Sequence, residues 1–273
     1  MRYIVSLSGG LGSAVTAEKT IERYGRSKVD LWFADTNWED DDLHRFMGDC
    51  MKRWGGKLHT FKDGRTPLEV ASDAKIIPNP MIAPCSYVLK VQPFEAFLWK
   101  NPRPVTVMLG LGWHEPHRIK SRRNYTRRMG KPKVPSGYPR RIPGVYEDFP
   151  LMWQPLDLRP AEQIVSSWGI RIPDLYLEGA PHNNCGRRCV KQGMKEWLYL
   201  LKTRPDSFAE VRDWEEEQRA KGGARANRAI LRDRKGGVSK PLTLAELQRQ
   251  NPDGLIQPNM PIDDQFSCAC TEM

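Results

Sequence analysis

Six consecutive residues near the start of the chain, Ser8, Gly9, Gly10, Leu11, Gly12 and Ser13, form a short glycine- and serine-rich segment. Glycines let backbone N–H groups approach an anion closely, and serine hydroxyls are additional donors. A helix that starts after such a turn contributes the positive end of its dipole. The segment lacks the Lys-Ser/Thr ending of a Walker loop. These residues therefore predict a phosphate-binding loop of another kind.

Cysteines are the second group of residues that could do chemistry; the chain has Cys50, Cys85, Cys185, Cys189, Cys268 and Cys270. We see no secretion signal, so metal or redox chemistry explains them better than a disulfide framework. Cys185 and Cys189 are four residues apart in a polar loop and can converge on one metal. Cys268 and Cys270 follow a proline-broken stretch, so either a metal holds them against that pair or they are catalytic thiols. Cys50 is expected to be a buried apolar residue of a helix.

Charge is concentrated in one segment. The chain has 43 Lys and Arg against 33 Asp and Glu, and residues 118–141 hold ten of the basic residues and no acid. Such a block stays exposed and indicates a polyanionic partner, with a solvated surface loop as the alternative. Its candidate contacts to nucleic acid are Arg122, Arg123, Arg127 and Arg128. Apolar runs are too short for a membrane helix, so we expect a soluble, cytoplasmic protein with no membrane partner.

The elements that position these residues follow from apolar runs and from glycine and proline breaks. Residues 2–7 predict a strand, 14–24 a helix that ends before Gly25, and 29–34 a second strand. Helix-forming composition recurs at 194–201, 207–221 and 242–250. We therefore expect an α/β domain over residues 1–190 and a small α-rich region with a cysteine-containing tail over residues 191–273.

Several motifs in order resemble one family, the adenine nucleotide alpha-hydrolase superfamily of PAPS reductases and PP-loop ATP pyrophosphatases. The SGGLGS turn is similar to its pyrophosphate loop, and DTNWE at 35–39 is similar to its DTGxE segment. CSYVLKVQP at 85–93, the GLGWHEPHR segment at 110–118 and the IPDLY segment at 172–176 are similar to further family motifs. The resemblance covers roughly residues 1–195 and implies a parallel doubly wound sheet of the HUP-like type.

The resemblance also implies cofactors. ATP or another adenine nucleotide, with Mg²⁺, would be bound by residues of the family motifs, namely Ser8, Gly9, Gly10, Gly12, Ser13, Asp35, Lys90, Glu115 and Arg118. In iron–sulfur members, a cysteine of the LKxxP element and a downstream pair bind a [4Fe–4S] cluster, and Cys85, Cys185 and Cys189 fall at matching places. Zn²⁺ and free redox thiols are the alternatives for these three cysteines.

Three functions fit these features. The first is ATP-dependent adenylation and sulfur transfer onto a nucleic acid, tRNA or DNA, with a sulfur donor protein as a further partner. It is favoured by the basic segment and by the absence of the ECGxH motif of the reductases, whose place SCACTEM takes. The second is a PAPS or APS reductase that uses Cys268 or Cys270. The third is an inactive nucleotide-sensing or nucleic-acid-binding protein.

Overall fold

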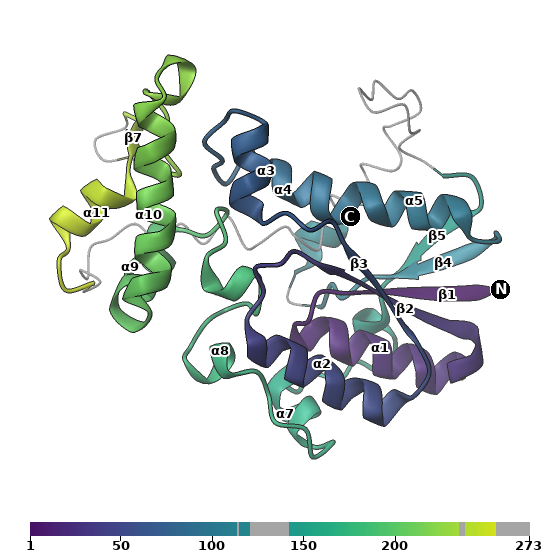
Figure 1. Ribbon diagram of the computed structural model, residues 1–273. Coiled ribbons are helices and arrows are strands. Elements are labelled where there is room, and N and C mark those ends of the chain that lie inside the picture. The colour runs from purple at the N-terminus through teal and green to yellow at the C-terminus, as the bar shows by residue number, and fades with distance from the viewer. Residues whose placement is uncertain (114, 121–141, 235–237, 255–273) are drawn as a thin grey trace. The chain divides into compact units, whose positions relative to one another are not determined.

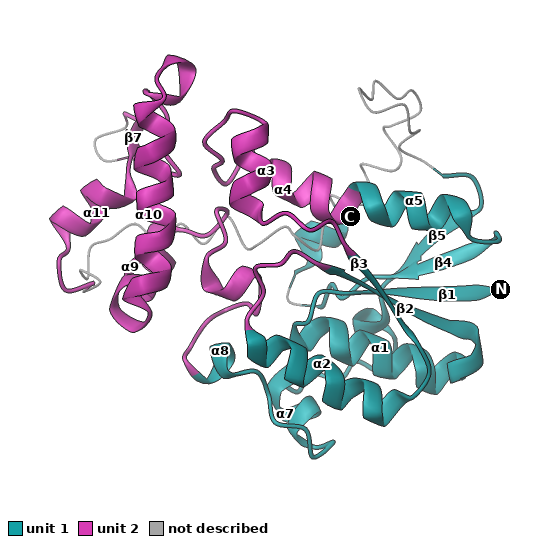
Figure 2. Cartoon of the chain, in the orientation of Figure 1, with its two compact units in different colours: residues 1–34, 41–61, 92–177 teal, residues 35–40, 62–91, 178–273 magenta. Residues whose placement is uncertain are grey.

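The computed structural model describes residues 1–113, 115–120, 142–234 and 238–254. The contacts within the chain group it into two compact units, which Figure 2 distinguishes by colour. Unit 1 comprises residues 1–34, 41–61 and 92–177, and unit 2 comprises residues 35–40, 62–91 and 178–273. The expected domains 1–190 and 191–273 stay a prediction. No helix in the described part of the chain is both long and apolar enough to cross a membrane.

Unit 1 is built on a five-stranded sheet with the order β3-β2-β1-β4-β5. Its strands are β1 (Arg2–Leu7), β2 (Val29–Asp35), β3 (Leu58–Lys62), β4 (Val105–Met108) and β5 (Val145–Asp148). Strand β1 pairs in parallel with β2 and β4, and β4 pairs in parallel with β5. Its helices are α1 (Leu11–Tyr24), α2 (Asp41–Trp54), α5 (Gln92–Lys100), α7 (Ala161–Ser166) and α8 (Asp174–Leu177), with 3-10 turns at Arg26–Lys28 and Pro150–Met152.

Helices cover both faces of this sheet. Leu31 and Phe33 of β2 belong to the core that α1, α2 and α7 share with the sheet. Trp32 points the other way and contacts Phe94 of α5 with ring centroids 4.7 Å apart. Figure 1 shows α1 and α2 on one face and α5 on the opposite face. Since successive side chains of a strand face opposite sides, a strand buried on both faces needs an unbroken apolar run. The predicted parallel doubly wound α/β fold is confirmed.

Unit 2 is mostly helical. Its helices are α3 (Pro67–Asp73), α4 (Pro84–Ser86), α9 (Met194–Thr203), α10 (Pro205–Ala220) and α11 (Leu244–Gln250), with a π-helical turn at Tyr87–Val91 and 3-10 turns at Cys185–Arg187 and Gly223–Arg225. Strands β6 (Leu231–Asp233) and β7 (Lys240–Leu242) form an antiparallel pair. The three predicted C-terminal helices are present, within a few residues of the predicted bounds. The β6-β7 pair was not predicted, because three-residue strands carry too little periodicity.

Two details concern residues that the sequence singled out. Helix α1 begins at Leu11 instead of residue 14. The carbonyl oxygen of Gly10 accepts the N–H of Ala14, so the second half of the glycine-rich segment is already the first helical turn. Cys50 of α2 is fully buried, as predicted.

A buried carboxylate joins three elements of unit 2. Glu215 of α10 is fully buried and accepts the N–H groups of Ile230, just before β6, and of Leu244, the first residue of α11, each at 2.7 Å. Desolvation by burial raises the pKa of Glu215 to about 7, although the two N–H groups and Arg219 favour the charged form. Glu215 thus connects the β6-β7 pair and α11 to α10 through backbone groups that have to be satisfied in the interior.

The raised pKa makes stability depend on pH in a defined window. Because the folded state retains the Glu215 proton up to about pH 7 and the unfolded state releases it near the ordinary glutamate pKa of 4.5, stability should fall as pH rises between these values. The contribution is at most about 3 kcal/mol. We expect urea unfolding of wild type to show this loss and Glu215→Gln to lack it, since other carboxylates titrate equally in both proteins. Identical pH slopes in the two proteins would contradict the assignment.

Candidate functional site

The glycine-rich segment of unit 1 is braced by its own serines. The Ser13 hydroxyl donates to the Gly10 carbonyl at 2.8 Å, and the Ser8 N–H donates to Ser13 Oγ at 3.2 Å. Ser8 Oγ lies 3.2 Å from Ser13 Oγ as well. Gly9 has φ +76°, and a Cβ there would lie 2.6 Å from two side-chain carbons of Leu43, so both the backbone conformation and the packing require glycine. Ser13 therefore stabilises the conformation of the loop through hydrogen bonds to Ser8 and Gly10.

The N-terminus of α1 has the properties of an anion site. Its N-cap is Gly10, no side chain caps it, and its first turn contains no acidic residue. The first N–H groups of a helix have no acceptor within the helix, and they carry the positive end of the dipole. One of them, from Leu11, donates to the hydroxyl of Tyr176 in α8 at 3.4 Å. The arrangement suits phosphate oxygens, which accept hydrogen bonds from several N–H groups at once.

A second loop lies against this one at the switch point of the sheet. Chain order runs from β1 to β2 and β3 on one side, and to β4 and β5 on the other, so the carboxyl ends of β1 and β4 border a crevice. Gly110 follows β4, and a Cβ on it would lie 3.2 Å from backbone atoms of Gly12 and from Thr16 Oγ1. The two loops approach through glycines, so a larger residue at Gly110 would require the loop at Gly12 to shift.

Glu115 and Arg118, predicted nucleotide contacts, form an ion pair with each other. Arg118 is buried, and its neighbours 116–120 are helical. Asp35, at the end of β2, accepts the N–H of Asn37 at 2.9 Å and lies 3.3 Å from Lys62 Nζ. Asn37 has φ +56°, so this Asp35 contact stabilises a left-handed turn. Nucleotide binding by these residues stays a prediction.

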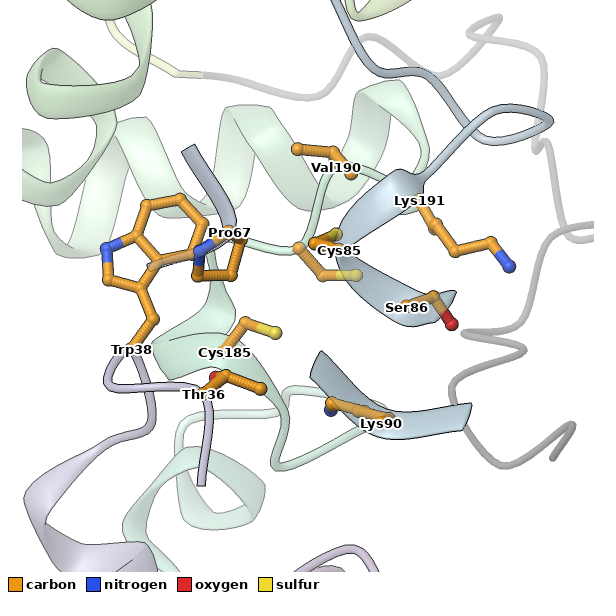
Figure 3. A pocket seen from close by; sticks show the side chains of 10 residues that line it. Thr36, Trp38, Pro67, Cys85, Ser86, Lys90, Cys185, Val190 and Lys191 are labelled. Carbon is orange, nitrogen blue, oxygen red and sulfur yellow. The ribbon is translucent and has the colours of Figure 1, made fainter. Parts of the chain in front are cut away.

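One pocket of unit 2 brings the three predicted metal ligands together (Figure 3). Cys85 comes from α4, Cys185 from the 3-10 turn that begins with it, and Cys189 from the loop after that turn. Cys185 and Cys189 are buried, and Cys85 is partly exposed. The remaining lining residues are Thr36, Trp38, Pro67, Ser86, Lys90, Val190 and Lys191. Residues up to 155 positions apart thus share one small space.

The turn that carries Cys185 is conformationally strained. Cys185, Gly186 and Arg187 all have positive φ, at 53°, 52° and 63°. Only glycine adopts this region freely, so the other two residues need support from their surroundings. Arg187 obtains it from Glu196, 3.1 Å away, and from the ring of Tyr199, 3.8 Å from the guanidinium carbon. Strain of this kind concentrates at functional sites.

Two cations next to the pocket, one buried and one partly buried, are paired with acids. Lys90, in the π-helical turn, has its Nζ 3.8 Å from Glu39, whose side chain is 1% exposed. Arg188 lies 2.5 Å from Glu210 and stacks over the ring of Trp38 at 4.5 Å. Such pairing is what burial of charge requires.

Ligation of a cluster or of zinc by Cys85, Cys185 and Cys189 stays a prediction. Within the described residues, no three His, Cys, Asp or Glu side chains are arranged around one metal ion. A structural zinc needs four ligands converging on one point. An iron–sulfur cluster takes cysteine thiolates on separate iron atoms. Cys268 and Cys270, the predicted catalytic thiols, and Arg122, Arg123, Arg127 and Arg128 lie outside the described residues.

Two side chains of these sites were not singled out from the sequence. Tyr176 contacts the phosphate loop across 165 positions, and Glu39 contacts the Cys185 turn across 146 positions. Both belong to segments quoted for the family resemblance, IPDLY and DTNWE. Their place in those motifs could have indicated a role for both residues. The contacts themselves could not be predicted, because they join residues far apart in sequence.

Comparisons with known proteins add only a remote structural similarity. No protein-family model and no curated protein matches the sequence. Among solved structures, phosphoadenylyl-sulfate (PAPS) reductase from Candida auris, in a phosphate complex, is similar at 16% identity. The match covers 66% of this chain and 78% of that chain, with a TM-score of 0.41. Similarity at this level says nothing about the activity of this chain.

The pocket makes a prediction about metal content. Anaerobically purified protein should be brown and contain iron and acid-labile sulfide, and Cys85→Ala, Cys185→Ala or Cys189→Ala should each reduce both, because each removes one thiolate from the pocket. Cys50→Ala is the matched control, since Cys50 lies in the core of unit 1. Colourless protein with one bound zinc per chain would contradict the cluster assignment.

Proposed function

We propose that the protein is a PP-loop enzyme that binds an adenine nucleotide at Ser8–Ser13 and uses ATP for adenylation and sulfur transfer onto a nucleic acid. The observation that carries the proposal is the loop itself. An uncapped helix N-terminus follows a strand at the switch point of a parallel sheet, and glycines line the approach of a second loop. This is where open α/β sheets bind nucleotides.

The proposed chemistry uses the loop as a holder of pyrophosphate. An oxygen of the acceptor attacks the α-phosphorus of ATP, the bond to the β-phosphate oxygen breaks, and pyrophosphate leaves. The N–H groups at the start of α1 hold the phosphate oxygens as negative charge moves onto the leaving group. A sulfur nucleophile then displaces AMP from the activated acceptor. Mg²⁺ would be held largely by the phosphates. Asp35, Lys90, Glu115 and Arg118 stay the predicted contacts to the rest of the nucleotide.

The thiol pocket of unit 2 supports sulfur chemistry. Cys85, Cys185 and Cys189 would hold an iron–sulfur cluster, with Cys268 or Cys270 from the undescribed part as a further thiolate or as the catalytic thiol. A bound cluster would supply a soft Lewis-acid surface for sulfur.

The choice of a nucleic acid as acceptor rests on the sequence alone. Residues 118–141 hold ten Lys and Arg and no acid, and most of them lie outside the described residues. Small sulfonucleotides do not need such a segment, whereas a polyphosphate backbone is attracted by it. A sulfur donor protein is a further proposed partner.

Nucleotide binding tests the first step. By calorimetry, Ser13→Ala should bind ATP about tenfold more weakly than wild type, since it removes the hydrogen bonds that brace the loop. Ser27→Ala, beyond the C-terminal end of α1, should bind like wild type. Gly110→Ala should weaken binding by crowding Gly12, with Gly48→Ala as control because a Cβ there has open space.

Equal ATP affinity in wild type and Ser13→Ala would remove the loop from the proposed site. Tight binding of PAPS with weak binding of ATP would instead favour a sulfonucleotide reductase. Nucleotide binding without turnover of either compound, with or without nucleic acid, would favour the nucleotide-sensing alternative.

Salt dependence tests the acceptor. Each phosphate contact contributes a slope of about −0.9 to log K against log salt for a duplex, or about −0.7 for a single strand. Neutralising Arg122, Arg123, Arg127 and Arg128 should therefore flatten the slope by about three units and leave ATP affinity unchanged. Absence of tRNA and DNA binding at low salt, or an unchanged slope in the quadruple variant, would exclude this acceptor class.

A further inference from the structure

Glu39 is a buried carboxylate on which three polar groups of unit 2 converge. Its Oε2 accepts the backbone N–H of Cys185 at 2.6 Å. Its Oε1 accepts the hydroxyl of Thr36 at 2.8 Å and lies 3.8 Å from Nζ of Lys90. Both oxygens are therefore engaged, and the side chain is 1% exposed. Thr36, Lys90 and Cys185 all line the cysteine pocket (Figure 3).

The bond to Cys185 acts at the point where the turn needs support. Cys185 is the first of three successive residues with positive φ, a conformation that a residue with a Cβ does not hold unaided. Within the turn, the N–H of Arg188 bonds to the Cys185 carbonyl at 2.9 Å, which closes the turn but does not anchor it. Glu39 anchors it, because its carboxylate belongs to a segment far away in the sequence.

The packing around the turn leaves little freedom for another arrangement. A Cβ on Gly186 would lie 3.3 Å from the carbonyl oxygen of Trp38, which immediately precedes Glu39. Arg188 also donates to that carbonyl oxygen, at 3.3 Å. The segment 35–40 and the turn 185–188 are thus in contact at several points, and the shortest of these hydrogen bonds is the one from Cys185 to Glu39.

We propose that Glu39 is the positioning residue of the pocket, which holds Cys185 in its left-handed conformation so that the thiol faces the space it shares with Cys85 and Cys189. The inference builds on the proposed use of these cysteines. Glu39 has this role because its side chain is long enough for the carboxylate to accept the Cys185 N–H. The ion pair between Glu39 and Lys90 contributes less to it.

Two conservative variants of Glu39 separate the effect of its side-chain length from the effect of its negative charge. Glu39→Gln keeps the length of the side chain: its carbonyl oxygen can accept the Cys185 N–H, and its NH₂ group can donate to Thr36. Glu39→Asp keeps the charge but withdraws the carboxylate by one methylene group. If Glu39 positions the turn, Glu39→Asp should loosen it and Glu39→Gln should not. If Glu39 serves only to compensate Lys90, the order should be reversed.

The measurement is the rate at which iodoacetamide labels Cys185, determined by peptide mass spectrometry on the full-length protein in excess chelator. Chelator makes the result independent of whether the cysteines carry a metal. We expect Glu39→Asp to label about tenfold faster or more, because a hydrogen bond to a charged acceptor is lost. We expect Glu39→Gln to stay within about threefold of wild type, since it keeps a weaker, neutral bond.

Three controls show whether a change in the labelling rate comes from a general loss of structure. Glu217→Gln changes an exposed acid of α10 that pairs with Lys221 and should leave the Cys185 rate near that of wild type. Cys50, whose pKa burial raises to about 12, should stay unlabelled in every variant and reports on unit 1. Amide exchange at Ile230 and Leu244, both bonded to Glu215, reports on unit 2.

The proposal would be overturned if Cys185 were labelled at the same rate in Glu39→Asp as in wild type. It would also be overturned if Cys185 were labelled faster in Glu39→Gln than in Glu39→Asp. The labelling needs neither nucleotide nor cluster. A protein that fails to bind ATP or iron can therefore still confirm the role of Glu39, and a failure of the labelling prediction leaves the nucleotide and metal measurements unaffected.

Discussion

Burial of charge is the constraint on which unit 2 depends. A cation taken out of water is tolerated only with a partner of opposite charge and good geometry. The buried Lys90 and Arg187 meet this condition through Glu39 and Glu196. The partly buried Arg188 and Arg204 pair with Glu210 and with Asp40 and Glu178. Because each partner lies in another segment, satisfying the charges also fixes the chain path around the cysteine pocket. The same pairs that permit burial therefore position the thiols.

Unit 1 has a different feature, a helix N-terminus whose first backbone N–H groups suit an anion. The parallel strands end at one edge, and the order of the strands separates the loops after β1 and β4 from their other neighbours. Glycines then matter for opposite reasons. Gly9 supplies a left-handed conformation, whereas Gly110 supplies room for its backbone to meet that of Gly12. The resulting loop has few polar side chains of its own and relies on Ser13 to keep its shape.

The two units thus offer complementary chemistry. Backbone dipoles at a helix N-terminus suit hard phosphate oxygens, and thiols in an enclosed pocket suit soft metals or sulfur. An enzyme that activates an acceptor with ATP and then delivers sulfur needs both kinds of site. A reductase needs a nucleotide site and a thiol as well, so the substrate, and not the architecture of either unit, separates the two functions.

The sequence by itself determined the features whose interactions are local. The bonds that Ser8 and Ser13 make within the glycine-rich loop join residues at most five positions apart, so the loop could be predicted from its glycines and serines, although its contact with Tyr176 could not. The strand–loop–helix order and the C-terminal helices followed from apolar runs and breaks for the same reason. Only the tertiary structure decided that Cys85 meets Cys185, that Glu39 anchors the Cys185 turn, and that Glu215 holds Ile230 and Leu244. Contacts of this kind depend on the whole path of the chain, which no local pattern of residues encodes.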